Sequence, residues 1–371
     1  MKGMHGIIFS YEKKTGLREL IDHRIHGSIP IGGEYRMVDF MLSNMVNAGI
    51  SDVGIIMQGK CQSMLDHLGT GKSWDLSRKR GGLTLLPAFA YMEGRGGPGK
   101  FRGKMEALSG VLNYLEEDIR QDYVVLADSD LMVNLPLDDV LEQHIATGAD
   151  ITCVCTARAG EMGDTCFILD ETGRIVDTMS DLQQPQGSAG LSIFVLSKEL
   201  LIRLVRHCAA HNLYSLRRDV LQGMGKELHL HAYIWEGYAA RINTIRGYYE
   251  RSMELLDPQV RAQLFCPQRP IYAKENDAGS TYIDPTGVCV NSLIADGCDI
   301  QGSVRNSIIF RGVQVEKGAQ VDGCILFKNT VVKKDAVLRN VIADKYVVFQ
   351  EGCMLMGHEH YPMVLGRGSV V

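Results

Sequence analysis

The chain has 371 residues, 45% of them hydrophobic, with 39 lysine and arginine residues against 44 aspartate and glutamate residues. A chain of this length can bury a large core and form two domains. Its formal net charge of -5 provides no basic field that would attract nucleic acid or an anionic membrane. We find no apolar run of signal-peptide or membrane-span length, so we expect a cytoplasmic protein.

Two kinds of candidate metal ligand occur in the chain. Ten cysteines lie in apolar segments without a C-x-x-C pair, which favours free buried thiols in a reducing compartment. His207 and His211 are four residues apart on a predicted helix, but no acidic residue or third ligand stands at a matching spacing. We therefore expect no metal site in this chain.

The first predicted unit is a strand, a loop and a helix within residues 6–47. An apolar strand covers residues 6–9, and apolar side chains at helical spacing over residues 38–45 predict a helix that stops at Gly49. Such a loop is where α/β proteins bind phosphate, because its backbone N–H groups point at the anion. Here the loop, residues 10–16, reads SYEKKTG and carries bulky side chains where a phosphate-binding loop needs bare backbone.

Strands and helices then alternate, which predicts right-handed βαβ units and a mostly parallel sheet. The expected strands are residues 52–57, 123–127, 151–157, 165–170 and 192–197, and the expected helices are residues 61–68, 106–115 and 198–210. Asp128 and Asp130 follow one of these strands directly. Carboxylates at the end of a parallel strand are suited to holding Mg²⁺, whereas the alternative is a polar strand end that caps the next helix.

The C-terminal part has a different periodicity. Prolines and glycines mark residues 257–282 as a connector, and beyond it aliphatic residues recur six apart, as in Ile294 and Ile300. This hexapeptide period predicts a left-handed parallel β-helix. We therefore expect an α/β domain over residues 1–256 and a β-helix over residues 283–371, whose open coil ends favour association with another domain or subunit.

Several segments carry a resemblance to one family. Residues 30–50, PIGGEYRMVDFMLSNMVNAGI, residues 69–87 and residues 291–310 resemble ADP-glucose pyrophosphorylase, glucose-1-phosphate adenylyltransferase. The resemblance implies a Rossmann-like, GT-A-like nucleotidyltransferase domain followed by a left-handed β-helix. It also implies a role in glycogen biosynthesis, where ATP and glucose 1-phosphate give ADP-glucose and pyrophosphate with Mg²⁺.

The chain departs from that family at the positions that carry the chemistry. The three loop glycines and the loop arginine of the family fall on Tyr11, Glu12, Lys14 and Gly16. The sugar-phosphate lysine of the family has no counterpart in residues 176–187. One metal-binding aspartate is kept as Asp130, the other falls on Arg246, and a neighbouring motif aspartate falls on Arg241.

This pattern resembles the GlgD-type subunit, the divergent partner of the catalytic enzyme. The resemblance then implies a catalytically degenerate, regulatory chain that needs no cofactor of its own, while Mg²⁺ serves the catalytic partner. The expected assembly is a hetero-oligomer with a catalytic ADP-glucose pyrophosphorylase subunit, built as a tetramer.

The replacement at Arg246 changes the sign of a charge in the expected metal site. At an effective dielectric constant of 20, a unit charge 4 Å away contributes about 4 kcal/mol, so a guanidinium would oppose a divalent cation by about twice that. We expect Arg246 to form a salt bridge with Asp130. The alternative is that Arg246 binds a phosphate directly.

The resemblance also implies an effector site between the two domains for a sugar phosphate. Arg24 and Arg36 match basic positions of the family there, and His26 stands where the family has a lysine. We expect Arg24, His26 and Arg36 to bind the anionic effector. The structural alternative for Arg36 is an ion pair with Asp39 across one helical turn.

Two other functions remain open at this point. In one, the chain is itself a working sugar-1-phosphate nucleotidyltransferase that uses Asp128, Asp130 and Arg246 in unusual roles. In the other, it is an acyltransferase of the β-helix type, with His358 or His360 as the base. Turnover of ATP plus glucose 1-phosphate tests the first, and turnover of acyl-CoA tests the second.

Overall fold

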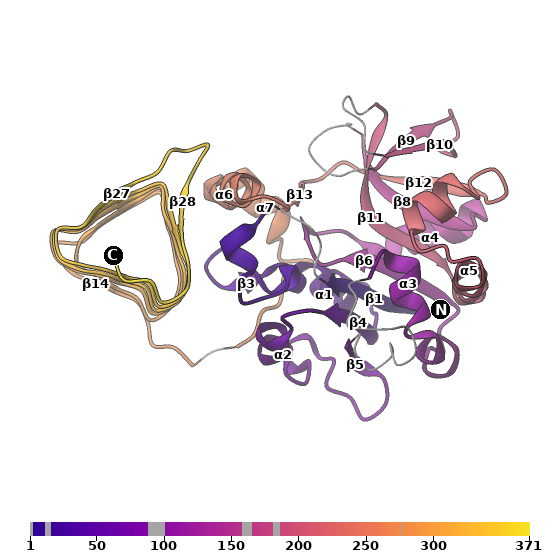
Figure 1. Cartoon of the computed structure of the whole chain (residues 1–371), viewed down its shortest axis with the longest axis horizontal. Coiled ribbons are helices and arrows are strands. Elements are labelled where there is room, and N and C mark those ends of the chain that lie inside the picture. The colour runs from indigo at the N-terminus through magenta and orange to yellow at the C-terminus, as the bar shows by residue number, and fades with distance from the viewer. Residues whose placement is uncertain (1–2, 12–15, 88–100, 158–164, 181–185, 276) are drawn as a thin grey trace.

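The computed structural model describes residues 3–11, 16–87, 101–157, 165–180, 186–275 and 277–371. Figure 1 shows an α/β domain beside a triangular coil of short strands, with the connector running between them. No helix in the described ranges is long and apolar enough to cross a membrane.

The α/β domain is built on one sheet with the order β10-β9-β11-β6-β1-β4-β5; β8 pairs with β11 as a branch of this order, and β12 pairs with β8. The half that carries the candidate site is parallel and contains β1 (Met4–Tyr11), β4 (Asp52–Gln58), β5 (Gly82–Pro87) and β6 (Tyr123–Asp128). The other half contains β8 (Ile151–Thr156), β9 (Thr165–Leu169), β10 (Ile175–Ser180), β11 (Ser188–Ser197) and β12 (Leu230–Trp235). There β11 runs antiparallel to β6 and β8, so the sheet is mixed and its first half has the predicted parallel arrangement.

Helices cover both faces of this sheet. They are α1 (Met37–Asn47), α2 (Gln62–Leu68), α3 (Lys104–Ser109), α4 (Leu137–Thr147) and α5 (Lys198–Ala210), with π-helical turns η5 (Tyr114–Asp118) and η6 (Leu216–Gln222). Successive side chains of β1 point to opposite faces, so Ile7 and Phe9 join the core under α3 and α5, and Ile8 joins the core under α1. One prediction differs from the structure: the helix predicted over residues 106–115 is split between α3, which ends at Ser109, and η5, which begins at Tyr114.

The C-terminal domain is a coil of parallel strands, as the six-residue period predicts. Its three sheets each hold five strands in the orders β14-β17-β20-β23-β26, β15-β18-β21-β24-β27 and β16-β19-β22-β25-β28. The first sheet consists of β14 (Tyr282–Ile283), β17 (Asp299–Ile300), β20 (Gln314–Val315), β23 (Val331–Val332) and β26 (Val348–Phe349). The second consists of β15 (Val288–Val290), β18 (Ser303–Arg305), β21 (Gln320–Asp322), β24 (Val337–Arg339) and β27 (Met354–Met356). The third consists of β16 (Leu293–Ile294), β19 (Ile308–Ile309), β22 (Ile325–Leu326), β25 (Val341–Ala343) and β28 (Met363–Leu365).

One corner of the coil is stacked through asparagine side chains. Asn291 and Asn306 adopt positive φ angles of 45° and 44°, a conformation that asparagine tolerates better than most residues. The Asn291 amide donates to Asn306 Oδ1 at 2.9 Å, and the Asn306 amide donates to Asp322 Oδ1 at 3.0 Å. The first three turns of the coil are thereby held to one another at this corner.

Helix α6 (Ile245–Met253) and the chain around Arg24 dock the α/β domain onto the coil. Tyr248 Oη donates to the Pro30 carbonyl at 2.7 Å, and Tyr249 Oη donates to the Gly323 carbonyl of the coil at 2.7 Å. Arg24 Nη2 lies 2.7 and 2.8 Å from the two carboxylate oxygens of Asp344, and both side chains are only 3% exposed. Helices η7 (Glu254–Leu256) and α7 (Pro258–Leu264) follow α6, and α7 lies within the residues assigned to the connector.

Candidate functional site

Asp128 and Asp130 lie at the carboxyl end of β6, beside the end of β1. Asp128 is in register with Phe9, and Ser129 Oγ donates to Ser10 Oγ at 3.0 Å. Both carboxylates are buried. This edge of the sheet is where open α/β folds bind their ligands, so the position agrees with the one expected from the sequence.

Two cations of the same chain contact these carboxylates. Arg241 Nη1 lies 2.9 Å from Asp130 Oδ1 and 3.6 Å from Asp128 Oδ2, and the Arg241 side chain is 9% exposed. Lys104 Nζ lies 3.0 Å from Asp128 Oδ1. We call Lys104, Asp128, Asp130 and Arg241 the ion-pair cluster.

Local structure places each of the two cations. Arg241 ends β13 (Ala239–Arg241), which pairs antiparallel with β7 (Leu131–Val133), the strand that follows Asp130 directly. The Arg241 Nη2 group also donates to the Leu191 carbonyl at 2.9 Å. Lys104 is the first residue of α3, and its amine lies 5.3 Å from the centroids of the Phe9 and Phe194 rings. The rings and the carboxylate together hold the ammonium in a fixed place.

The ion-pair cluster does not fit a divalent cation. A divalent ion about 4 Å from one of these positive charges would be opposed by about 8 kcal/mol at an effective dielectric constant of 20. Asp130 already accepts hydrogen bonds from Arg241 and Asp128 is ion-paired with Lys104, so such an ion would have to break these contacts. In the described part of the chain, no group of three or more histidine, cysteine, aspartate or glutamate side chains is arranged to hold a metal ion.

The predicted salt bridge between Arg246 and Asp130 is wrong. Arg246 lies in the first turn of α6 with its side chain 59% exposed, and its Nε donates to Glu250 Oε1 at 2.6 Å one helical turn away. Asp130 pairs with Arg241 instead. The reason is the strand pairing, because β13 carries Arg241 to Asp130 before α6 begins.

The loop positions at which this chain differs from the family lie in different surroundings. Tyr11 ends β1 and is buried, with its ring 5.6 Å from the Phe101 ring in an edge-on contact. Gly16 donates its N–H to the Asn243 carbonyl at 2.9 Å, which ties the loop to the segment before α6. Glu12 and Lys14 lie outside the described residues. Tyr11 therefore supplies core packing at a position where the family has a glycine.

Sequence reasoning did not identify Lys104 as part of this site. Lys104 stands next to Gly103 at the start of α3, two residues before the helix expected over residues 106–115. A Cβ on Gly103 would lie only 2.3 Å from the Tyr214 carbonyl oxygen, so this position holds the start of α3 close to that segment. The partner of Lys104, however, depends on the placement of α3 against β6, which is a tertiary feature.

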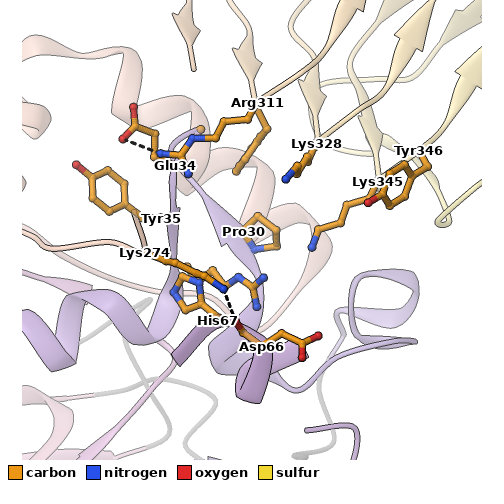
Figure 2. A pocket seen from close by; sticks show the side chains of 13 residues that line it. Pro30, Glu34, Tyr35, Asp66, His67, Lys274, Arg311, Lys328, Lys345 and Tyr346 are labelled. Atoms are coloured by element: carbon orange, nitrogen blue, oxygen red, sulfur yellow. Dashed lines mark hydrogen bonds and ion pairs between the residues drawn. The ribbon is translucent and has the colours of Figure 1, made fainter. Parts of the chain in front are cut away.

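A second site lies between the two domains, and we call it the interdomain pocket (Figure 2). It is lined by Pro30, Gly33, Glu34, Tyr35, Arg36, Asp66, His67, Lys274, Phe310, Arg311, Lys328, Lys345 and Tyr346. Five of these side chains are cationic and two are carboxylates. In Figure 2 the amines of Lys328 and Lys345 reach into the pocket from the coil, and Lys274 faces them from the connector.

Arg36 is the cation that the α/β domain contributes to the pocket. Its Nη1 donates to the Ser63 carbonyl and, at 3.0 Å, to Ser63 Oγ. Asp39 Oδ2 accepts from the backbone N–H of Arg36 at 2.9 Å, and Asp39 Oδ1 lies 2.6 Å from His67 Nε2. Asp39 thus contacts the Arg36 backbone and His67, rather than forming the ion pair with the guanidinium that we considered as an alternative.

Burial perturbs the pKa values of the pocket cations. The pKa of Arg36 is lowered to about 10, chiefly by burial and in part by the charge of nearby Arg24, while Asp39 opposes the shift. The pKa of Lys345 is likewise lowered to about 8, chiefly by burial and in part by the positive charges of Arg36 and Arg24. The pocket is therefore a place where positive charges are crowded and short of negative partners.

Only one of the three residues expected to bind an effector lines this pocket. That residue is Arg36. Arg24 lies behind the pocket wall in its buried pair with Asp344, and His26 is buried in the short helix η2 (His26–Ser28). The lysines at 274, 328 and 345 and Arg311 were not anticipated, because they come from the connector and from separate turns of the coil.

The remaining histidine candidates lie apart from both sites. His207, in the last turn of α5, and His211, which follows the helix, stack with their ring centroids 4.3 Å apart. His358 and His360 lie in the turn between β27 and β28, where His360 Nδ1 is 4.0 Å from Glu250. Neither pair supports the chemistry considered for it.

Comparison with known proteins supplies the family context. A nucleotidyl transferase family model matches residues 13–177, and a GlmU-like C-terminal hexapeptide model matches residues 280–361. The chain is 34% identical over 367 residues to the "Glycogen biosynthesis protein GlgD" of Bacillus subtilis (strain 168), a match that covers 99% of this chain and 96% of that protein. It is 34% identical to the protein of that name from Geobacillus stearothermophilus, covering 86% and 82% of the two chains. It is 31% identical to the "Glucose-1-phosphate adenylyltransferase" of Thermotoga neapolitana, covering 86% and 77%.

Proposed function

The chain belongs to the family of glucose-1-phosphate adenylyltransferases and GlgD-type glycogen biosynthesis proteins, and on this premise we propose that it is a regulatory, catalytically degenerate subunit. Its partner in the cytoplasm is a catalytic relative that converts ATP and glucose 1-phosphate into ADP-glucose and pyrophosphate. The two form a hetero-oligomer, for which we propose a tetramer, and Mg²⁺ serves the partner only.

The ion-pair cluster is the observation that supports this proposal most strongly. Nucleotidyl transfer depends on positioning polyphosphate and neutralising its charge, work that a metal ion does in such sites. Here Arg241 and Lys104 contact the carboxylates that would hold that ion. Tyr11 adds to this, because its buried side chain occupies a position where a phosphate-binding loop needs free backbone.

The interdomain pocket supports the regulatory part of the proposal. A sugar phosphate carries negative charge, and the pocket is lined by five cations, Arg36, Lys274, Arg311, Lys328 and Lys345, against the two carboxylates of Glu34 and Asp66. These cations come from the α/β domain, the connector and the coil, so a bound anion would draw all three together. Such a ligand could change how the chain contacts its partner, because it binds where the two domains meet.

Activity measurements with and without a partner test the proposal. The purified chain alone should show negligible turnover of ATP plus glucose 1-phosphate with Mg²⁺. Co-purified with a catalytic relative from the same organism, it should shift the activation curve for sugar phosphates. Turnover by the chain alone at a rate close to that of the catalytic relative would overturn the proposal, as would failure of the two chains to co-purify.

Within the described residues, no observation favours either of the two other functions. The self-sufficient enzyme would use Arg246 near Asp130, whereas Arg246 pairs with Glu250 at the surface. The acyltransferase would use His358 or His360 as a base, and both lie in an exposed turn of the coil.

A further inference from the structure

Lys345 occupies an unusual position in the interdomain pocket. It follows β25 in the coil, and Figure 2 shows its amine pointing into the pocket on the same side as the amine of Lys328. The backbone of Lys345 is anchored, since its N–H donates to Asp344 Oδ1 at 2.7 Å and its carbonyl accepts from Gly368 at 3.0 Å. The side chain is partly buried and still opens to the pocket.

The ammonium group of Lys345 lacks a close negative partner. Its neighbour Asp344 accepts two hydrogen bonds from Arg24, and Glu34 lies 3.7 Å from Arg311. Within the described residues, no carboxylate oxygen lies within 4.0 Å of the Lys345 amine. The charged groups around it are Arg24, Arg36, Lys328, Arg367 and Asp344.

A lysine in these surroundings is unusually often neutral. Burial removes water from the ammonium, and the guanidinium groups of Arg36, Arg24 and Arg367 repel it. The pKa of Lys345 falls to about 8 for these reasons. At this pKa about half of the molecules carry a neutral, nucleophilic amine at pH 8 and about a tenth at pH 7, in a solvent-accessible pocket.

We propose that Lys345 is a reversible carbamylation site, at which the side-chain amine adds dissolved carbon dioxide among the cations of the interdomain pocket. The neutral amine forms an N–C bond to the carbon of CO₂, and one C=O π bond opens with its electron pair moving to oxygen. The nitrogen then loses a proton to water. Starting from the ammonium form, one CO₂ is taken up and two protons are released, with no change of oxidation state.

The pocket is suited to the product as well as to the amine. A carbamate carries a planar, carboxylate-like anion, the partner geometry that guanidinium groups bind best. The neighbours that disfavour the ammonium, above all Arg36, become attractive once the charge at this position is negative. This modification goes beyond the proposed function, because it requires neither a sugar phosphate nor a partner subunit.

Isotope labelling and chemical trapping on the full-length chain test the proposal. The chain is equilibrated with ¹³C-bicarbonate at pH 8, and its ¹³C NMR spectrum is recorded for a carbamate resonance. In parallel, a trialkyloxonium salt converts the carbamate to a stable ester, which peptide mass spectrometry then locates. We expect one dominant resonance and an ester on the peptide that contains Lys345.

Two variants provide the comparison. Lys345→Arg should lose the resonance, whereas the control Lys334→Arg should keep it, because Lys334 is 57% exposed on the same coil and pairs with Glu351. Arg36→Gln should lower the occupancy several-fold, since it removes a cation that favours both the neutral amine and the carbamate. Trapping on the unsubstituted chain keeps the test decisive even if a variant folds poorly.

The dependence of carbamate occupancy on pH and on inorganic phosphate provides a further check. Occupancy should rise between pH 7 and pH 8.5 as the amine loses its proton, and inorganic phosphate should lower it by competing for the same cations. No resonance that depends on Lys345 at saturating bicarbonate, or ester spread evenly over exposed lysines, would overturn the proposal. Failure of the proposed regulatory function would leave this result unchanged, because the assay contains neither partner nor nucleotide.

Discussion

The ion-pair cluster and the interdomain pocket use charged side chains in opposite ways. In the cluster, Asp128 and Asp130 contact Lys104 and Arg241 of the same chain, and all four side chains are largely buried. In the interdomain pocket, five cations share two carboxylates and face an opening. In the ion-pair cluster, side chains of the same chain balance the charges of both carboxylates. In the interdomain pocket, the cations outnumber the carboxylates. A site of the first kind contributes to stability, and a site of the second kind contributes to binding.

Removing a cation from the cluster should have the largest effect on stability. Arg241→Ala leaves two buried carboxylates without their guanidinium, and breaking a buried pair in this way costs about 3–5 kcal/mol. The control Arg246→Ala removes an exposed arginine that pairs with Glu250, and should cost about 0–1 kcal/mol. Urea unfolding of both variants measures the difference. Equal losses for the two would contradict the assignment of Arg241 as the buried partner.

Restoring negative charge in the cluster should recover a metal site. In the double variant Arg241→Asp with Lys104→Ala, two repelling charges are removed, each of which would oppose a divalent ion 4 Å away by about 8 kcal/mol at an effective dielectric constant of 20. We expect Mn²⁺ to bind at least about tenfold more tightly than to the unsubstituted chain. Titration calorimetry and the Mn²⁺-induced rise in melting temperature measure this.

The paired variant Arg246→Asp provides the control for that experiment. It changes the residue that stands at the family's metal position but lies at the surface beside Glu250. It should leave Mn²⁺ binding at the level of the unsubstituted chain. A gain there and none in the double variant would mean that Arg246, and not Arg241, blocks the metal.

Removing a cation from the interdomain pocket should weaken binding and spare stability. Lys328→Gln removes one partner of a bound anion, and a hydrogen bond to a charged group is worth about 1.5 kcal/mol or more, so the Kd for inorganic phosphate should rise about tenfold. The free energy of unfolding should change by less than about 0.5 kcal/mol. Lys334→Gln, which lies outside the pocket, should alter neither quantity. A stability loss as large as that of Arg241→Ala would erase the contrast between the two sites.

The smallest expected effect is a pH dependence of anion binding. The pKa of Lys345 is lowered to about 8, and a bound anion raises it back toward its usual value, so binding takes up a proton above that pH. Affinity for phosphate should therefore be highest below pH 8 and fall as the pH rises through it, by about threefold from pH 8 to pH 9. Calorimetry in CO₂-free buffers measures this fall. In the variant Lys345→Arg the side chain stays charged over this range, so the affinity for phosphate should not fall between pH 8 and pH 9. An identical pH profile in both proteins would refute the role of Lys345.

The architecture could be predicted from local patterns. The six-residue period of the C-terminal part depends on which side chains point into a coil, and this is visible as spacing in the sequence. The strand and helix alternation of the first part likewise comes from apolar periodicity. The predicted elements differ from the structure where tertiary packing decides the backbone conformation, as in the split of residues 106–115 into α3 and η5.

The candidate site was predictable in its carboxylates and not in their partners. Asp128 and Asp130 directly follow a predicted strand, which is a local signal. Arg241 and Arg246 are two arginines in one short segment, and choosing between them requires the register of β13 against β7. Lys104 reaches Asp128 only because α3 packs beside the end of β6.

The sequence by itself determined the two-domain plan, the hexapeptide coil and the loss of the glycine-rich loop, because each depends on residues close together in the chain. Only the tertiary structure decided that Arg241 and Lys104 neutralise the carboxylates and that Arg24 is buried against Asp344. It also decided that lysines from the connector and the coil meet Arg36 in one pocket. The physical reason is that Coulomb energy depends on distance in space, and sequence separation does not set that distance until the sheet and the two domains have packed.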